Sequence, residues 1–588
     1  MHTLARFIDA ALADARPQAF AERLGRPEWT FTSTSAMRER AGRIARALRT
    51  AGVERGDRVA LVAENSVAWI AASFGIHFAG AVPVPVFSTQ ALDQLDYIFR
   101  DSEAKVCFVD SPAAAERIGN GCSNAPRLIA LYGDDGEALG PFIAAVPSFD
   151  PPASAELAED VTQDDLAVLI YTSGTTGDPK GVMLLNRNIV SNATSSVGYL
   201  MQDRALGPNE PVLSVLPFAH IYEHNNLLGY ISQRSNIYVT QPDYLLEDLK
   251  SSRPYMLAFV PRIFERILSG IVGRAKAEGG VKARLVPWAL GAGRDYVAAT
   301  FAGGRAPVAT SLQYAVAQRL VLSKIKPAAG FDRIVLVSSG SAPLHRDIAF
   351  TFAGLGIPIC EGYGLTETSP VLTVNLPAAN RFGSVGKPIP GVSIEIAADG
   401  EILAKGPNIM AGYYHLSAER PFTDDGWFKT GDIGEIDADG FLFITDRKKE
   451  LLKTSAGKYV APGRVESALK RSIYVGQCFV VGDGRPFPVA LVCPNWDNVR
   501  RELGFDASVP NAAVAERADV RQLIGREVVE KTADLASFEQ VRRFALLPRD
   551  LTIENGELSP TMKVKRRIVE KKFADLIESA YVRPAVAV

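Results

Sequence analysis

Residues 171–181 read Tyr-Thr-Ser-Gly-Thr-Thr-Gly-Asp-Pro-Lys-Gly and concentrate glycines, hydroxyls and a lysine in one short segment. Apolar runs on either side, Leu166 to Ile170 and Val182 to Leu185, predict flanking strands. Glycines let a backbone turn sharply and aim its N–H groups at one point, while the hydroxyls and Lys180 add donors and positive charge. Such a segment suits a polyphosphate, although its spacing is not that of a Walker loop. A plain surface turn is the weaker interpretation.

Residues 220–224, His-Ile-Tyr-Glu-His, could support a different chemistry because they fit H-x-x-E-H, an inverted zinc-peptidase signature. That signature needs a helix that places both histidines on one face, and a distant third ligand. Pro217 stands three residues upstream, at the end of an apparent strand, and short motifs match readily by chance. A zinc peptidase is therefore kept only as a remote alternative, and His224 is expected to be a structural histidine.

The remaining motifs come in a fixed order along the chain, at residues 216–223, 260–265, 340–343, 361–367, 427–432, 446–458 and 554–567. With all of them in this order, the chain resembles the superfamily of AMP-forming acyl and aryl ligases, which includes acyl-CoA synthetases, peptide-synthetase adenylation domains and firefly luciferase. The resemblance spans roughly Thr30 to Arg567. The stretches 216–223, 260–265 and 446–458 are most similar to the long-chain fatty acyl-CoA synthetases.

The resemblance implies a two-step reaction. A long-chain fatty acid would be activated by ATP to acyl-AMP with release of pyrophosphate, and the acyl group would then pass to the thiol of CoA, giving acyl-CoA and AMP. Mg²⁺ is the implied cofactor. A fatty acyl-AMP ligase or a ligase that loads acyl carrier protein would share nearly every motif, so both stay open, as does a nucleotide-sensing protein without turnover. The length of the acyl chain is left open.

The resemblance also assigns roles to individual residues. Those implied for catalysis are Lys563, Glu367, Thr366 and His220. Those implied for binding ATP and AMP are Thr172, Ser173, Gly174, Thr175, Thr176, Gly177, Lys180, Gly340, Ser341, Ala342, Glu361, Gly362, Tyr363, Gly364, Asp432 and Arg447. Thr176 and Glu367 are the implied Mg²⁺ ligands, Lys449 the hinge, and Lys453, Thr454, Ser455, Ala456 and Gly457 the CoA channel. The chemistry agrees, since Tyr363 can stack on adenine, Asp432 can accept both ribose hydroxyls, and Mg²⁺ prefers carboxylate oxygen.

Short apolar runs alternate with helix-length segments and would position these groups in an α/β protein with mixed, largely parallel sheets. Examples are residues 58–62, 166–171, 212–216, 236–240, 256–260 and 334–337. From about Gly383 the pattern changes to hairpins with Asp-Gly turns, typical of antiparallel strands. Residues 1–446 are predicted to be a large domain with the ATP and acyl pockets and a β-rich part at about 383–445. Residues 447–588 are predicted to be a small, mobile α+β domain, with helices at 462–470 and 511–533.

Composition narrows the function classes. The 588 residues are 47% hydrophobic with a formal net charge of −2, which argues against a whole-protein grip on nucleic acid. Five scattered cysteines without a C-x-x-C pair predict neither a disulfide framework nor a zinc site, and favour the reducing cytoplasm. The longest uncharged run, Asn65 to Leu92, is interrupted by prolines and predicts a buried helix at 67–79 rather than a membrane span.

Long fatty acids partition into bilayers, so any membrane contact is expected to be peripheral, at the inner membrane face. The sequence leaves the oligomeric state open.

Overall fold

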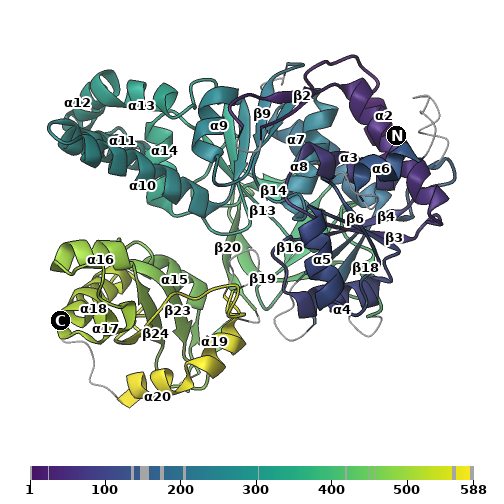
Figure 1. Ribbon diagram of the computed structural model, residues 1–588. Helices are drawn as coiled ribbons and strands as arrows, with labels where there is room; N and C mark the ends of the chain where they lie inside the picture. Colours follow the sequence, from purple (N-terminus) through teal and green to yellow (C-terminus); the bar gives the residue numbers. More distant parts are fainter. Residues whose placement is uncertain are drawn as a thin grey trace.

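The computed structural model of the protein describes residues 3–23, 26–133, 138–145, 158–172, 178–202, 207–301, 304–416, 420–448, 450–455, 457–558 and 564–582. Within them the fold is α/β, as predicted, with a large part and a smaller C-terminal part that lies below it in Figure 1. Among these residues no helix combines the length and apolarity that crossing a bilayer requires.

A nine-stranded mixed sheet organises the large part, in the order β15-β14-β13-β12-β11-β9-β10-β1-β2. From β13 to β1 neighbouring strands are parallel, and antiparallel strands close both edges. The strands are β1 (Phe20–Glu22), β2 (Thr30–Thr32), β9 (Pro211–Ser214), β10 (Asn236–Val239), β11 (Met256–Phe259), β12 (Leu336–Ser339), β13 (Ile359–Gly364), β14 (Val371–Val374) and β15 (Lys387–Pro388).

Consecutive residues of these strands enter two different cores, because side chains alternate across a sheet. Val212, Met256 and Leu336 join one core, whereas Leu213, Leu257 and Val337 join the other. Burial on both faces explains why the strands are continuous apolar runs. The helices of the first core are α1 (Leu4–Ala11), α2 (Thr34–Thr50), α3 (Val67–Phe78), α6 (Leu139–Ala144), α7 (Asn186–Leu200) and α8 (Ile221–Ser232). Those of the second are α9 (Leu245–Ser252), α10 (Pro261–Glu278), α11 (Lys282–Phe301), α12 (Val308–Ala317), α13 (Ser323–Ala328) and α14 (Arg346–Gly354), with a π-helical segment, Gln318–Leu322, before α13.

Two smaller sheets complete this end of the molecule. A parallel four-stranded sheet has the order β4-β3-β5-β6, and an antiparallel three-stranded sheet has the order β18-β8-β7. Their strands are β3 (Arg58–Val62), β4 (Val82–Val86), β5 (Val106–Val109), β6 (Arg127–Ala130), β7 (Leu166–Thr172), β8 (Lys180–Leu185) and β18 (Gly412–Tyr413), with helices α4 (Leu92–Ser102) and α5 (Pro112–Gly121). The predicted helix at 67–79 is confirmed as α3, which is buried along its whole length.

The predicted β-rich stretch is an antiparallel four-stranded sheet with the order β16-β17-β19-β20. Its strands are β16 (Ser393–Ile396), β17 (Glu401–Lys405), β19 (Phe428–Ile436) and β20 (Leu442–Arg447). Gly400 and Gly440 end the two Asp-Gly turns, each with φ +85°, a backbone conformation that favours glycine.

The C-terminal part has a core of its own around the sheet β23-β24-β25, with the hairpin β21-β22 beside it. Its elements are β21 (Leu452–Lys453), β22 (Tyr459–Val460), α15 (Pro462–Leu469), β23 (Val475–Val481), β24 (Val489–Pro494), α16 (Trp496–Leu503), α17 (Asn511–Glu516), α18 (Ala518–Thr532), β25 (Arg543–Leu546), α19 (Arg566–Lys572) and α20 (Ala574–Val582). The prediction of one helix at 511–533 is wrong, because Arg517 is extended (φ −70°, ψ 141°) and separates α17 from α18. The domain boundary at 446/447 falls at the end of β20 and stays a prediction.

Candidate active site

Several of the predicted residues lie at the edge formed by the carboxyl ends of the parallel strands. Strand β12 ends at Ser339, two residues later than the predicted strand at 334–337, so Gly340 follows it directly. The Tyr222 hydroxyl lies 2.8 Å from the Ser338 hydroxyl, and a Cβ on Gly340 would come within 3.3 Å of the Tyr222 ring. The start of α8, where His220 is the N-cap, therefore lies beside the segment Gly340–Ala342.

Asp432 is the best-defined acidic group at this edge. Its carboxylate, 4% exposed, accepts hydrogen bonds from the Tyr363 hydroxyl (2.6 Å) and from Nε of Arg447 (2.8 Å). Burial and the neighbouring carboxylate raise the pKa of Tyr363 well above its usual value, so the phenol stays a donor. Three residues predicted from separate motifs are thus in direct contact. A carboxylate offers about four acceptor sites, and only these two side chains of the described residues occupy sites on Asp432.

The glycines of the 361–364 motif serve backbone packing. A Cβ on Gly364 would collide with the carbonyl oxygen of Pro370. The carboxyl of Glu361 accepts a hydrogen bond from Leu344 N (3.3 Å), and its contact with a nucleotide stays a prediction. Burial raises the pKa of Glu361 to about 7. Glu361 thus ties down the chain that follows Gly340–Ala342.

Glu367 and Lys180 lie on either side of Tyr413, a residue that the sequence did not single out. Glu367 belongs to a 3₁₀ turn that begins at Thr366, and it accepts a hydrogen bond from the Tyr413 hydroxyl (2.9 Å). The ammonium of Lys180 lies 5.4 Å from the centroid of the Tyr413 ring, a cation–π distance. Tyr413 reaches this place because β18 pairs with β8, opposite Val182. The sequence offered no signal for Tyr413 beyond its aromatic side chain, because β18 is only two residues long.

Part of the predicted phosphate segment is described. Thr172 ends β7 and pairs with Lys180 at the start of β8, so the two predicted flanking strands are present and pair antiparallel. The predicted residues Ser173, Gly174, Thr175, Thr176, Gly177, Lys449, Ala456 and Lys563 lie outside the described residues.

The chain is fixed on both sides of the predicted hinge. Before it, the ammonium of Lys448 lies 2.5 Å from Asp399 and 2.7 Å from Glu401. After it, Glu450 pairs with Arg566 at 3.5 Å. The predicted CoA-channel residues Lys453, Thr454, Ser455 and Gly457 lie in and beside the hairpin β21-β22, where Thr454 N donates to Lys458 O (2.9 Å) and Ser455 N to Arg485 O (2.8 Å). In the described part of the chain, no hydrogen bond or ion pair joins this hairpin to Asp432 or Glu367.

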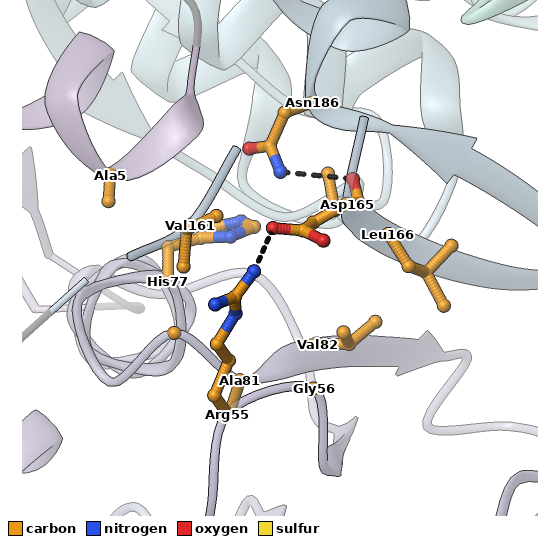
Figure 2. A pocket seen from close by; sticks show the side chains of 12 residues that line it. Ala5, Arg55, Gly56, His77, Ala81, Val82, Val161, Asp165, Leu166 and Asn186 are labelled. Carbon is orange, nitrogen blue, oxygen red and sulfur yellow. Dashed lines mark hydrogen bonds and ion pairs between the residues drawn. The ribbon is translucent and has the colours of Figure 1, made fainter. Parts of the chain in front are cut away.

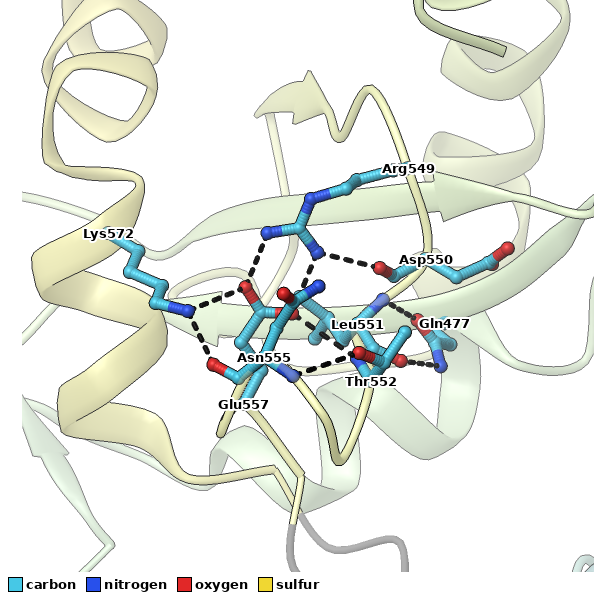
Figure 3. A network of polar contacts seen from close by, with 8 residues as sticks. All are labelled: Gln477, Arg549, Asp550, Leu551, Thr552, Asn555, Glu557 and Lys572. Atoms are coloured by element: carbon cyan, nitrogen blue, oxygen red, sulfur yellow. Dashed lines mark hydrogen bonds and ion pairs between the residues drawn. The ribbon is translucent and has the colours of Figure 1, made fainter.

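A buried acid, Glu557, holds together the turn that precedes residue 559 (Figure 3). Glu557 is fully buried. Its carboxylate accepts hydrogen bonds from both Nη atoms of Arg549 (2.6 and 2.8 Å), from Lys572 Nζ (3.4 Å) and from Thr552 N (3.2 Å). Next to it, Lys565 N donates to Glu557 O (2.8 Å), and Leu558 forms a bridge with Val564. Leu558 and Val564, the described residues nearest the predicted catalytic lysine, are therefore held together.

The zinc alternative gains no support. His220 Nδ1 accepts a hydrogen bond from Tyr222 N (3.2 Å), and His224 is buried with its ring against Trp69. Glu223 is buried and accepts hydrogen bonds from Ser214 and Asn226, so it is not presented to a substrate. Within the described ranges, no three His, Cys, Asp or Glu side chains are grouped to hold a metal ion.

A cavity of about 350 Å³ lies elsewhere, between the N-terminal helix and the sheets (Figure 2). Arg55 and Asp165 form an ion pair at 2.5 Å on its wall. The side chain of Asn186 accepts a hydrogen bond from Leu4 N and donates one to Asp165 O. His77 also lines it, and burial lowers the pKa of this histidine to about 3, so it is neutral. None of the predicted site residues lines this cavity, which leaves the sheet edge as the candidate site.

Comparison with known proteins shows the family to which the chain belongs. A family model described as AMP-binding enzyme matches residues 12–414, and one described as AMP-binding enzyme C-terminal domain matches residues 449–585. The chain is 34% identical over 562 residues to the long-chain-fatty-acid–CoA ligase FadD15 of Mycobacterium bovis, covering 94% of this chain and 92% of that one. It is 30% identical over 558 residues to the human long-chain-fatty-acid–CoA ligase 1, covering 89% and 78% of the two chains.

Solved structures share the fold. The adenylation domain of a carboxylate reductase from Mycobacterium chelonae superposes with a TM-score of 0.76 at 22% identity, covering 99% of this chain and 91% of that one. The anthranilate CoA ligase AuaEII, solved with anthranoyl-AMP, gives 0.73 at 19% identity, with 98% of each chain covered. With family models matching both parts of the chain and curated relatives matching nearly all of it, the protein belongs to the AMP-binding enzyme family.

Proposed function

We propose that this protein activates a long-chain fatty acid with ATP, forming acyl-AMP and pyrophosphate, and then transfers the acyl group to the thiol of CoA. Family membership and the names of the two curated relatives support the reaction class. The observation that carries the proposal is the double contact of Tyr413, which joins Lys180 of the phosphate segment to Glu367 of the nucleotide motif.

Adenylation needs charge neutralisation around the α-phosphorus. A fatty carboxylate attacks there, pyrophosphate leaves, and negative charge develops on the phosphate oxygens. Two kinds of group would donate hydrogen bonds to those oxygens. The side-chain donors would be Lys180, Thr366, Lys563 and the hydroxyls of Thr172, Ser173, Thr175 and Thr176. The backbone donors would be the N–H groups of Gly174 and Gly177. Asp432, with two acceptor sites remaining, would receive the ribose hydroxyls, while Tyr363 and the segment Gly340–Ala342 would hold adenine. His220 would lie beside the acid's carboxylate.

The residues present fit a magnesium ion. Glu367 is half-buried, and within the described residues Tyr413 is the one hydrogen-bond donor to its carboxylate, which leaves hard oxygen sites for a cation. Glu367 and Thr176 would hold the ion, which when bound would neutralise charge on the phosphates.

Thiolysis needs room where the catalytic lysine stood. The two-domain division at 446/447 would allow the small domain to turn about Lys449, because the residues on either side are anchored to different parts. In the second state Lys453 to Gly457 would line the path of the thiol. We further infer a cytoplasmic enzyme that reaches membranes only peripherally.

Pyrophosphate release measured over an acid series from acetate to C18 tests the proposal, with and without CoA. We expect release to rise with chain length and acyl-CoA to form only with CoA. Release with no acid would contradict the function. Release without acyl transfer to CoA, but with transfer to a phosphopantetheine-bearing protein, would identify a carrier-protein ligase instead.

A further inference from the structure

Exposed apolar side chains are concentrated on the helices at one end of the large part, seen at the left of Figure 1. Of the 18 large apolar side chains that are exposed within the described residues, eight lie between Val281 and Leu320. Val308 is 86% exposed, Leu312 65% and Leu320 52%. Single exposed apolar residues are ordinary, but a contiguous group marks an interaction surface.

Four of these residues form a stripe along α12 and the π-helical segment after it. Val308, Leu312, Val316 and Leu320 recur every four residues, so they lie on one side of the helix. The opposite side is anchored, since the Tyr314 ring stacks on Tyr296 with 4.3 Å between centroids and its hydroxyl donates to Gly354 O (3.1 Å). The helix thus has a packed inner face, and its outer apolar face is open in the described structure.

The charge around this stripe is strongly basic. Residues 261–328 contain eleven Lys and Arg against three Asp and Glu, a net charge of +8 in a chain whose total is −2. Two of the three acids are neutralised locally, Glu278 by Lys282 (2.7 Å) and Asp295 by Arg294 (2.8 Å). Three exposed basic residues flank the stripe itself, namely Arg305, Arg319 and Lys324.

We propose that helices α10 to α13 dock the protein on an anionic lipid bilayer. The apolar stripe enters the boundary between headgroups and acyl chains through Val308, Leu312, Val316 and Leu320. The flanking basic residues Arg305, Arg319 and Lys324 contact lipid phosphates. An apolar helix face edged by basic residues complements such a surface in both polarity and charge. The choice of a bilayer rests in part on the proposed function, because a long-chain acid resides in bilayers. The exposure and charge of the surface are independent of it.

Sedimentation with sucrose-loaded vesicles, without substrates, tests the docking separately from the enzymatic function. We expect binding to vesicles of equal phosphatidylglycerol and phosphatidylcholine, and little binding to phosphatidylcholine alone. Leu312→Gln with Leu320→Gln should weaken binding at least tenfold, because two leucine side chains would no longer contribute apolar burial to the free energy of binding. Arg305→Gln, Arg319→Gln and Lys324→Gln together should weaken it about a hundredfold at low salt.

A matched control carries the same change on exposed apolar residues elsewhere, Leu246→Gln with Ile473→Gln, and should bind like the wild type. Pyrophosphate release with a short, soluble acid should be unchanged in all these variants and shows that they fold. Absence of wild-type binding, or equal binding by the stripe variant, would overturn the proposal. A concentration-dependent dimer that the stripe variant abolishes, without vesicle binding, would also overturn it and assign the face to a second copy.

Discussion

Two buried carboxylates, one in each part of the molecule, differ in how far their acceptor sites are filled. Glu557 in the C-terminal part has four donor contacts, three of them from the cations Arg549 and Lys572. Asp432 in the large part has two, from Tyr363 and Arg447. A saturated carboxylate holds structure together, whereas a buried one with free acceptor sites is prepared for a ligand. We therefore expect Asp432 to act in binding and Glu557 to act in stability.

The largest effect should come from Lys563, the predicted catalytic lysine. We expect Lys563→Ala to slow adenylation by ~10²–10³-fold, the cost of losing one charged donor in a transition state. Thiolysis of supplied acyl-adenylate should stay near the wild-type rate, because that step does not need the donor. Rapid-quench assays of the two half-reactions make the measurement. Lys572→Ala is the control and should leave the ratio of the two rates unchanged, while equal loss of both steps in Lys563→Ala would refute the division of roles.

Asp432→Asn should act on nucleotide affinity. The substitution keeps the shape but removes the charge and replaces one of the two acceptor oxygens with an NH2 donor, so the ribose hydroxyls lose a partner. We expect KM for ATP to rise by ~10-fold or more, with a change in thermal midpoint of a few degrees at most. The comparison fails if Asp432→Asn unfolds the protein while KM for ATP stays at the wild-type value.

Glu557→Gln should show the reverse pattern. Arg549 and Lys572 lose their counter-charge, but both are partly exposed, so we expect a loss of ~1–3 kcal/mol in the free energy of unfolding at pH 7. KM for ATP should not change. Denaturant unfolding followed by circular dichroism measures the first quantity, and a rise in KM without loss of stability would contradict the structural role.

The same variant gives a pH test. Desolvation opposes ionisation of Glu557, but the hydrogen bonds from Arg549 and Thr552 outweigh it and lower its pKa. The stabilisation is therefore complete above the unfolded value of ~4.3 and disappears as pH falls through the lower folded value. We expect the stability difference between wild type and Glu557→Gln to shrink as pH is lowered from 5 to 3.

Replacing Glu223 should change the free energy of unfolding by a smaller amount and with the opposite dependence on pH. Burial raises its pKa to about 7, and hydrogen bonds from Ser214 and Asn226 do not offset that burial. Between ~4.3 and about 7 the folded state holds a proton that the unfolded chain has lost, so stability falls as pH rises. Glu223→Gln should thus be more stable than wild type at pH 8, by ~1–2 kcal/mol, and equal to it near pH 4. A matched surface change, Glu210→Gln, should alter neither value.

Much of this organisation could be predicted from the sequence. The Asp-Gly hairpins, the buried helix α3 and the strands on both sides of the phosphate segment follow from local periodicity and turn chemistry. The order of the motifs indicated which residues meet, and the contact of Tyr363, Asp432 and Arg447 agrees with it.

The rest depends on long-range pairing. Tyr413 reaches Glu367 only because β18 pairs with β8, more than two hundred residues away in sequence. The carboxyl of Glu361 accepts a hydrogen bond from Leu344 N, a contact that its motif alone does not predict. The break at Arg517 depends on its own extended backbone, which hydrophobic periodicity does not encode. That all acceptor sites of Glu557 are filled could not be predicted, because the sequence does not show that Arg549, Thr552 and Lys572 converge on its carboxylate.

Lys563 and the carboxylate of Asp432 are expected to act on one nucleotide. A crystal structure of the protein with an unreactive ATP analogue and a long-chain acid measures this directly. We predict ribose hydroxyls on Asp432 and Nζ of Lys563 at ~3 Å from a phosphate oxygen of the same molecule. A nucleotide held by Asp432, with residues 558–564 on the far side of the protein in every crystal form, would contradict the account.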